Sequence, residues 1–89
     1  MKAVITVIGK DKIGIIAEIA LVLAKSRANI LDISQTILQD YFTMIMIVDL
    51  EKINISFMEL TDDLNRAGER IGMSIKVQHE EIFNGMHKI

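Results

Sequence analysis

The sequence predicts an α+β sandwich in which one sheet of four antiparallel strands carries two helices on a single face. Three observations lead to this prediction. Segments with strand-like and helix-like periodicity follow one another in the order βαββαβ. The second and third strands along the chain are joined by a turn short enough for a hairpin. The other connections are long enough for two right-handed crossovers, which interleave in the ferredoxin-like arrangement.

The first half of the chain is predicted to form a strand, a helix and a second strand. Residues 2–9 alternate between two apolar faces, which is typical of a strand. Residues 14–27 place apolar side chains at helical spacing. Residues 29–39 alternate again, with Ile33 and Gln35 on the same face and polar side chains on the other.

The second half is predicted to form a strand, a helix, a strand and a short helical tail. Residues 42–50 form the third strand, which pairs with the second as a hairpin. The next helix begins at Asn54 or Ser56, and the serine stands three residues before a glutamate, the spacing of a capping box. Residues 73–78 alternate as a fourth strand, and residues 80–89 suit a short final helix.

The composition indicates one folded domain, residues 1–89, and excludes several classes of function. Hydrophobic residues make up 51% of the chain and charged residues 25%, as in globular modules. Without cysteine there are no disulfides, thiol nucleophiles or cysteine-bound metals. A net charge of −2, one tyrosine and three phenylalanines argue against a surface that binds nucleic acid.

The sequence also gives no sign of a membrane or secretory segment. No apolar run reaches the roughly 18 residues that a membrane span requires. The first residues lead into a strand and then into charged Lys10, without the cleavage pattern of a signal peptide. We therefore expect a cytoplasmic protein.

The segment Gly9–Ala17, with the sequence GKDKIGIIA, is the most informative part of the chain. It joins a predicted strand to a predicted helix through two glycines. The first backbone N–H groups of such a helix are unpaired, and the helix dipole favours negative charge beside them. The loop is therefore suited to bind a small anion. Alternatively, the glycines serve only the backbone conformation of the turn.

The third predicted strand is apolar on both of its faces. Alternate positions from Phe42 to Leu50 are apolar, and so are Ile45 and Ile47 between them. Two helices cover only one face of a sheet, and each apolar side chain left in water forgoes about 1.5–3 kcal/mol of burial. We therefore expect a homodimer, with residues 80–89 contributing to the cover of the second face.

The predicted topology and two segments together resemble an ACT domain. One segment is the loop Gly9–Ala17, and the other is Ala28–Gln35, with the sequence ANILDISQ. The last residues, Glu81–Ile89, resemble the ending of small bacterial proteins that consist of an ACT domain alone. The chain is similar, more distantly, to the ACT modules of glycine-cleavage regulators and formyltetrahydrofolate hydrolases.

The resemblance implies a regulatory module that binds an amino acid or a related metabolite, without a cofactor. In ACT domains the ligand usually lies beside the first strand-to-helix loop, close to a subunit interface. The corresponding positions are Asp11, Lys12, Ile13, Gly14 and Ile15 in the loop and Asn29 at the start of the second strand. A ligand carboxylate would accept from the N–H groups around Gly14 and Ile15. Asp11 would pair with an ammonium group, and the Asn29 amide would both donate and accept.

Several of these residues also have structural explanations. Asp11 is equally expected to cap the first helix, and Lys12 to be a solvated charge. Asn29 can satisfy backbone groups where the helix passes into the strand. Arg27 stands where the family commonly has a glycine that ends the first helix in a left-handed conformation. Either the helix runs on, or strain of about 1 kcal/mol is tolerated.

Three classes of function remain, of which we favour a dimeric regulator whose ligand shifts the population of dimer geometries. The same surfaces would serve an adaptor that binds an unidentified protein while the loop binds nothing. A small enzyme is disfavoured, because no histidine, cysteine or carboxylate pair lies beside the glycines as nucleophile or base. His79 and His87 have no set of carboxylates at ligand spacing, so we expect no metal.

Overall fold

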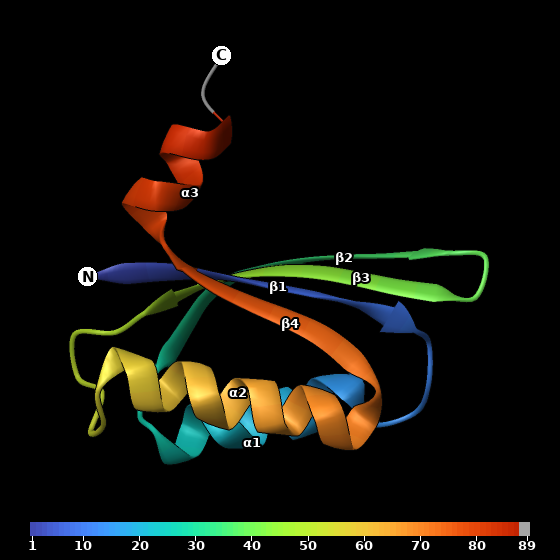
Figure 1. Ribbon diagram of the computed structural model, residues 1–89, viewed down its shortest axis with the longest axis horizontal. Coiled ribbons are helices and arrows are strands. Elements are labelled where there is room, and N and C mark those ends of the chain that lie inside the picture. The colour runs from blue at the N-terminus through green and yellow to red at the C-terminus, as the bar shows by residue number, and fades with distance from the viewer. Residues whose placement is uncertain (88–89) are drawn as a thin grey trace.

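The computed structural model describes residues 1–87, with side chains described through residue 85. Its elements, in chain order, are β1 (Lys2–Lys10), α1 (Ile15–Lys25), β2 (Asn29–Leu38), β3 (Tyr41–Asp49), α2 (Phe57–Ile71), β4 (Met73–His79) and α3 (Glu80–His87). The four strands form one antiparallel sheet in the order β2-β3-β1-β4 (Figure 1). This confirms the predicted ferredoxin-like topology. Residues 88–89 of the predicted tail lie outside the described residues.

The core lies between one face of the sheet and the helices α1 and α2 (Figure 1). Successive side chains of a strand point to opposite faces, so alternate residues of β1 and β3 reach the helices. The buried side chains of these two strands on this face are Ala3, Ile5, Val7, Phe42, Met44, Met46 and Val48. They pack against buried residues of α1, among them Ile19, and of α2, among them Leu64. The core thus fixes both helices across the sheet.

The first helix ends earlier than predicted, at Lys25, and the left-handed turn is kept despite Arg27. The φ angle of Arg27 is 62°. Its N–H donates to the carbonyl of Ala24 at 3.2 Å, and the N–H of Ala28 donates to the carbonyl of Leu23 at 2.9 Å. These two bonds are those of a Schellman motif, whose left-handed position is usually glycine. Of the two predicted alternatives, the structure therefore shows the second. The helix does not run on, and Arg27 adopts the strained left-handed conformation.

The second helix begins at the predicted capping box. The Oγ atom of Ser56 accepts from the Glu59 N–H at 3.0 Å, and the Ser56 N–H donates to Oε1 of Glu59 at 3.2 Å. Asn54, the other predicted start, precedes the helix. Its Nδ2 donates to the carbonyl of Lys25 at 3.0 Å, and its N–H donates to the carbonyl of Ser26 at 3.1 Å. Asn54 therefore ties the loop before α2 to the end of α1.

The second face of the sheet carries an apolar stripe flanked by polar positions. Val4, Ile8, Ile45 and Ile47 form an apolar stripe along β1 and β3, and Leu38 and Tyr41 lie on the same face at the hairpin end. The positions beside this stripe are mostly polar: Thr6, Asp32, Ser34, Thr36, Thr43, Ser74 and Lys76. The tail helix α3 contacts β1 and β4 and rises away from the sheet (Figure 1). It therefore covers only one end of this face.

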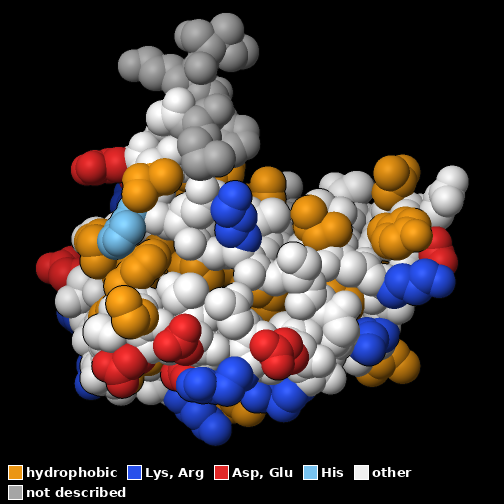
Figure 2. All heavy atoms as spheres, viewed as in Figure 1, with side chains coloured by type: hydrophobic (Ala, Val, Ile, Leu, Met, Phe, Trp, Pro, Cys, Tyr) orange, Lys and Arg blue, Asp and Glu red, His pale blue; other side chains and the backbone are white. Residues whose placement is uncertain are grey.

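One edge of the sheet, formed by β2, carries exposed apolar side chains. Ile33 and Ile37 pair with core residues of β3, yet they are 42% and 49% exposed, so α1 does not cover this edge. Figure 2 shows apolar side chains gathered at the hairpin end of β2 and β3. Edge strands are commonly protected by lysine, proline or bulges. Here the protection is limited to Asp32 and an irregularity between Ile30 and Asp32.

Candidate functional site

The loop between β1 and α1 borders an open cleft of about 310 Å³. Four of the six predicted site residues line it: Asp11, Lys12, Gly14 and Ile15. Ile13, by contrast, does not line the cleft, and its side chain is fully exposed. The side chain of Ile15 is buried in the core, so a ligand in the cleft would meet mainly its backbone.

The N-terminus of α1 opens toward this cleft without a side-chain cap. The N-cap residue is Gly14, whose φ of 94° lies in the left-handed region that favours glycine. The Glu18 N–H donates to the carbonyl of Gly14 at 3.0 Å, as the first bond of the helix. The N–H groups of the turn before Glu18 have no acceptor within the helix. Together with the helix dipole, they make this end of α1 suited to an anionic group.

Asp11 does not cap α1, so this structural explanation is excluded. Instead, its backbone N–H donates to the carbonyl of Asp40 in the β2–β3 hairpin at 2.8 Å. An ion pair of 3.4 Å between Lys10 and the Asp40 carboxylate joins the same two segments. The loop is thus held against the hairpin, while the side chain of Asp11 lines the cleft and remains exposed.

Lys12 extends from the loop to the C-terminal end of α2. A Cβ atom placed on Gly72, the C-cap of α2, would lie 3.4 Å from Nζ of Lys12. The close approach of this turn to β1 depends on Gly9, where a Cβ atom would lie only 2.9 Å from the Gly72 carbonyl oxygen. The exposed ammonium group therefore lies near the negative end of the α2 dipole.

Asn29 lies at the opposite end of the sheet from the loop. It pairs with Asp49, which also pairs with Lys2 at the start of β1. The loop follows the other end of β1, and the length of that strand puts the start of the loop roughly 26 Å from Asn29. Asn29 lines a separate cleft of about 330 Å³ with Arg27. Within one subunit, Asn29 therefore does not belong to the loop cleft.

The loop cleft also includes residues beyond those predicted from the sequence. Gln35 of β2 and Phe42 of β3 line the cleft opposite the loop. Gln35 carried a signal, because it is a polar residue between Ile33 and Ile37 on an otherwise apolar face of its strand. Its side-chain amide brings both a donor and an acceptor to the cleft.

Other side chains with potential chemistry have structural surroundings. His79 stacks on the ring of Phe57, with 4.0 Å between centroids and 15° between planes. In the part of the chain that the structure describes, no three His, Cys, Asp or Glu side chains are grouped to hold a metal ion. None of the helices described up to residue 87 is both long and apolar enough to cross a membrane.

The fold and the cleft define a small ferredoxin-like sandwich with a ligand-sized cleft at the start of its first helix. The sequence model of the ACT domain matches residues 2–78. The chain therefore belongs to the ACT domain family, whose members are commonly regulatory modules that bind small ligands and often dimerise.

Full-length relatives and a solved structure agree with this assignment. A UPF0237 protein of Clostridium acetobutylicum is 55% identical over 89 residues, with all of both chains covered. A UPF0237 protein of Methanococcus maripaludis is 57% identical over 86 residues, covering 97% of this chain and 96% of that protein. The ACT domain protein of Streptococcus pneumoniae superposes with a TM-score of 0.81 at 41% identity, covering 93% of each chain.

Proposed function

We propose that this protein is a cytoplasmic regulatory module that binds a free amino acid, or a closely related metabolite, in the cleft beside the β1–α1 loop. The observation that carries the proposal is the uncapped N-terminus of α1, which meets a cleft rimmed by a carboxylate. A zwitterionic amino acid has one charged group for the helix N-terminus and one for the Asp11 carboxylate. Its carboxylate would accept from the N–H groups after Gly14, and its ammonium would pair with Asp11.

The other walls of the cleft fit the remainder of such a ligand. The apolar ring of Phe42 and the side chain of Ile16 offer surface for a side chain of the ligand. Gln35 offers hydrogen bonds from the opposite strand. The left-handed Gly14 leaves the approach open, since nothing lies within 4 Å of a Cβ atom placed on it.

The proposed module acts as a homodimer that forms through the β2 edge. This edge offers unpaired backbone groups together with the exposed side chains of Ile33 and Ile37. Two copies related by a two-fold axis would pair their β2 strands antiparallel and extend the sheet. The narrower apolar stripe on the second face of the sheet is the alternative surface.

Pairing of the β2 edges would bring Asn29 of one subunit close to the loop cleft of the other, although Asn29 does not reach the loop cleft of its own subunit. In an antiparallel pair, the start of one β2 lies beside the end of the other. The partner's Asn29 would then lie near the hairpin end of this chain, where the loop cleft opens beside Gln35. A ligand bound at this border would favour one dimer geometry over another, and a protein partner would respond to that geometry.

A thermal-shift screen over the twenty amino acids tests ligand binding. A ligand at ten times its Kd stabilises the folded state by about 1.4 kcal/mol, which raises the Tm of a domain of this size by roughly 5–10 °C. Asp11→Asn should abolish most of the shift, while Asp62→Asn, an exposed carboxylate on α2, should leave it unchanged. If no amino acid raises the Tm, the protein is better explained as an adaptor for another protein.

Light scattering on interface variants tests the dimer. The wild-type mass should be about twice the 10.0 kDa of one chain. Ile37→Lys on the β2 edge should give monomers, whereas Ile8→Lys on the second face of the sheet should remain dimeric. If only Ile8→Lys gives monomers, the interface lies on the second face of the sheet and not on the β2 edge. A monomeric wild type would refute the dimer.

A further inference from the structure

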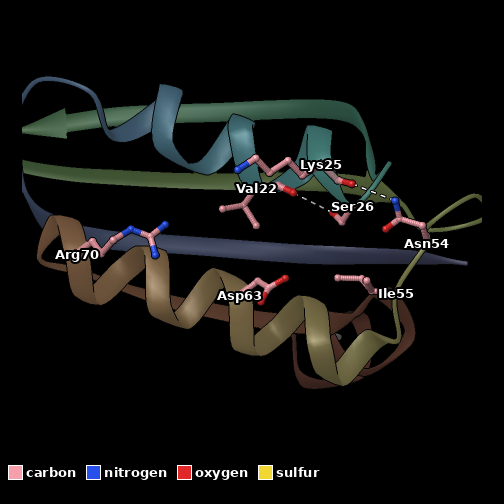
Figure 3. Close-up of a pocket in the computed structure, with 7 residues that line it drawn as sticks. All are labelled: Val22, Lys25, Ser26, Asn54, Ile55, Asp63 and Arg70. Atoms are coloured by element: carbon pink, nitrogen blue, oxygen red, sulfur yellow. Dashed lines mark hydrogen bonds between the residues drawn. The ribbon is translucent and has the colours of Figure 1, made fainter.

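A second cleft, of about 360 Å³, opens between α1 and α2 on the side of the helices away from the sheet (Figure 3). It shares no lining residue with the loop cleft. Figure 2 shows acidic and basic side chains gathered over this helical layer. The second cleft therefore differs from the loop cleft in both place and charge.

Three charged side chains converge on this cleft from both helices. Lys25 comes from α1, and Asp63 and Arg70 come from α2. In Figure 3, the head groups of Lys25 and Arg70 point toward one another across the opening, and the carboxylate of Asp63 points into it. A cleft that presents two cations and one anion can distinguish small ligands by the arrangement of their charges.

The charged groups keep hydrogen-bonding capacity for a ligand. Nε and Nη2 of Arg70 donate to Oε1 of Glu18, at 3.1 and 3.0 Å. A guanidinium has five N–H donors, so three remain. Asp63 binds Arg66 through its Oδ1 atom, which leaves its Oδ2 atom for a ligand. Within the described residues, Lys25 has no ion pair.

The rest of the lining combines two apolar side chains, Val22 and Ile55, with the polar Ser26 and Asn54, whose hydrogen bonds hold it in place. Val22 and Ile55 extend into the opening from opposite sides (Figure 3). The backbone next to them is fixed, because Asn54 bonds to the carbonyls of Lys25 and Ser26. Oγ of the buried Ser26 donates to the Val22 carbonyl at 3.0 Å. Apolar walls of this kind suit methylene groups of a ligand.

We infer that this cleft binds an acidic α-amino acid, a ligand with two carboxylates and one ammonium. Lys25 and Arg70 contribute two positive charges and Asp63 one negative charge, so the lining carries a net charge of +1. Glu18, which pairs with Arg70, and Arg66, which pairs with Asp63, add one negative and one positive charge, so they leave this net charge unchanged. A ligand of net charge −1 balances this site, with its carboxylates on the two cations and its ammonium on Asp63. The inference goes beyond the proposed function and does not depend on the loop cleft.

An NMR titration of the ¹⁵N-labelled full chain tests this inference and locates the ligand. The probes are L-glutamate and glutarate, which differ only by the ammonium group. L-glutamate should shift amide signals around Val22 and Ile55, and glutarate should bind several-fold more weakly because Asp63 has no ammonium to pair with. Equal binding of the two probes, or no shifts around the cleft with 10 mM L-glutamate, would overturn the inference.

Variants distinguish this site from the loop cleft. Arg70→Gln and, separately, Lys25→Gln should each weaken L-glutamate binding about tenfold, since each removes a charged hydrogen bond. Asp63→Asn should remove the preference for L-glutamate over glutarate, and Asp62→Asn, its neighbour in sequence, is the matched control. Gly14→Ala should leave these shifts intact. Loss of binding in Gly14→Ala, with no loss in Arg70→Gln, would place the ligand in the loop cleft and refute the second site.

Discussion

The left-handed residue at the end of α1 gives a sharp test of how this chain tolerates strain. Arg27 has a φ of 62° in a Schellman motif whose two backbone bonds are both formed. An L-residue in this conformation costs about 1–2 kcal/mol relative to glycine. Glycine recovers that cost but loses about 0.5–1 kcal/mol more conformational entropy on folding. Arg27→Gly should therefore stabilise the protein by about 0.5–1 kcal/mol.

Chemical denaturation at fixed protein concentration measures this change in the free energy of unfolding. In thermal unfolding, the Tm of Arg27→Gly should rise by roughly 2–8 °C. Arg27→Ala is the matched control, because it removes the guanidinium but keeps the Cβ atom that causes the strain. The alanine variant should change the free energy of unfolding by less than about 0.5 kcal/mol. Equal stabilisation by Arg27→Gly and Arg27→Ala would show that repulsion of the guanidinium, and not the backbone conformation, is relieved. A destabilised Arg27→Gly would refute the reasoning altogether.

Two further predictions concern α2, which borders the second cleft. Gly68→Ala should destabilise the protein by about 1–2 kcal/mol, because a Cβ atom there would lie 2.6 Å from the Met73 carbonyl oxygen. Gly85→Ala in α3 is the control: nothing lies within 4 Å of its Cβ position, so thermal unfolding should show unchanged or higher stability. Ser56→Ala should cost about 1 kcal/mol by removing the capping box, as measured by denaturant unfolding. The exposed Ser74→Ala should change the stability little, and an equal loss in both serine variants would contradict the capping role.

The sequence alone determined the order of the elements, because the apolar period differs between strands and helices and most segments here keep a clear period. The alternation of β1 and β3 divided their residues into two apolar faces, and only the structure shows which face packs against the helices. The spacing of Ser56 and Glu59 predicted the start of α2. Local backbone chemistry controls a helix cap, so a pair three residues apart is sufficient to locate it. The resemblance to ACT domains indicated the loop residues Asp11–Ile15, and because they are adjacent in the chain four of them share the cleft, whereas Ile13 does not line it.

Only the tertiary structure decided which distant residues share a site. The resemblance groups Asn29 with the loop, but β1 and β2 run in the same direction, so Asn29 lies at the far end of the sheet. Lys12 reaches the end of α2 because Gly9 lets a turn some sixty residues later approach β1. The cleft of Lys25, Asp63 and Arg70 exists only because the core packs α1 beside α2. The apolar period separates the residues of an element into faces. Contacts between elements depend on the crossing angles of helices and on the register of strands, and no local pattern encodes either.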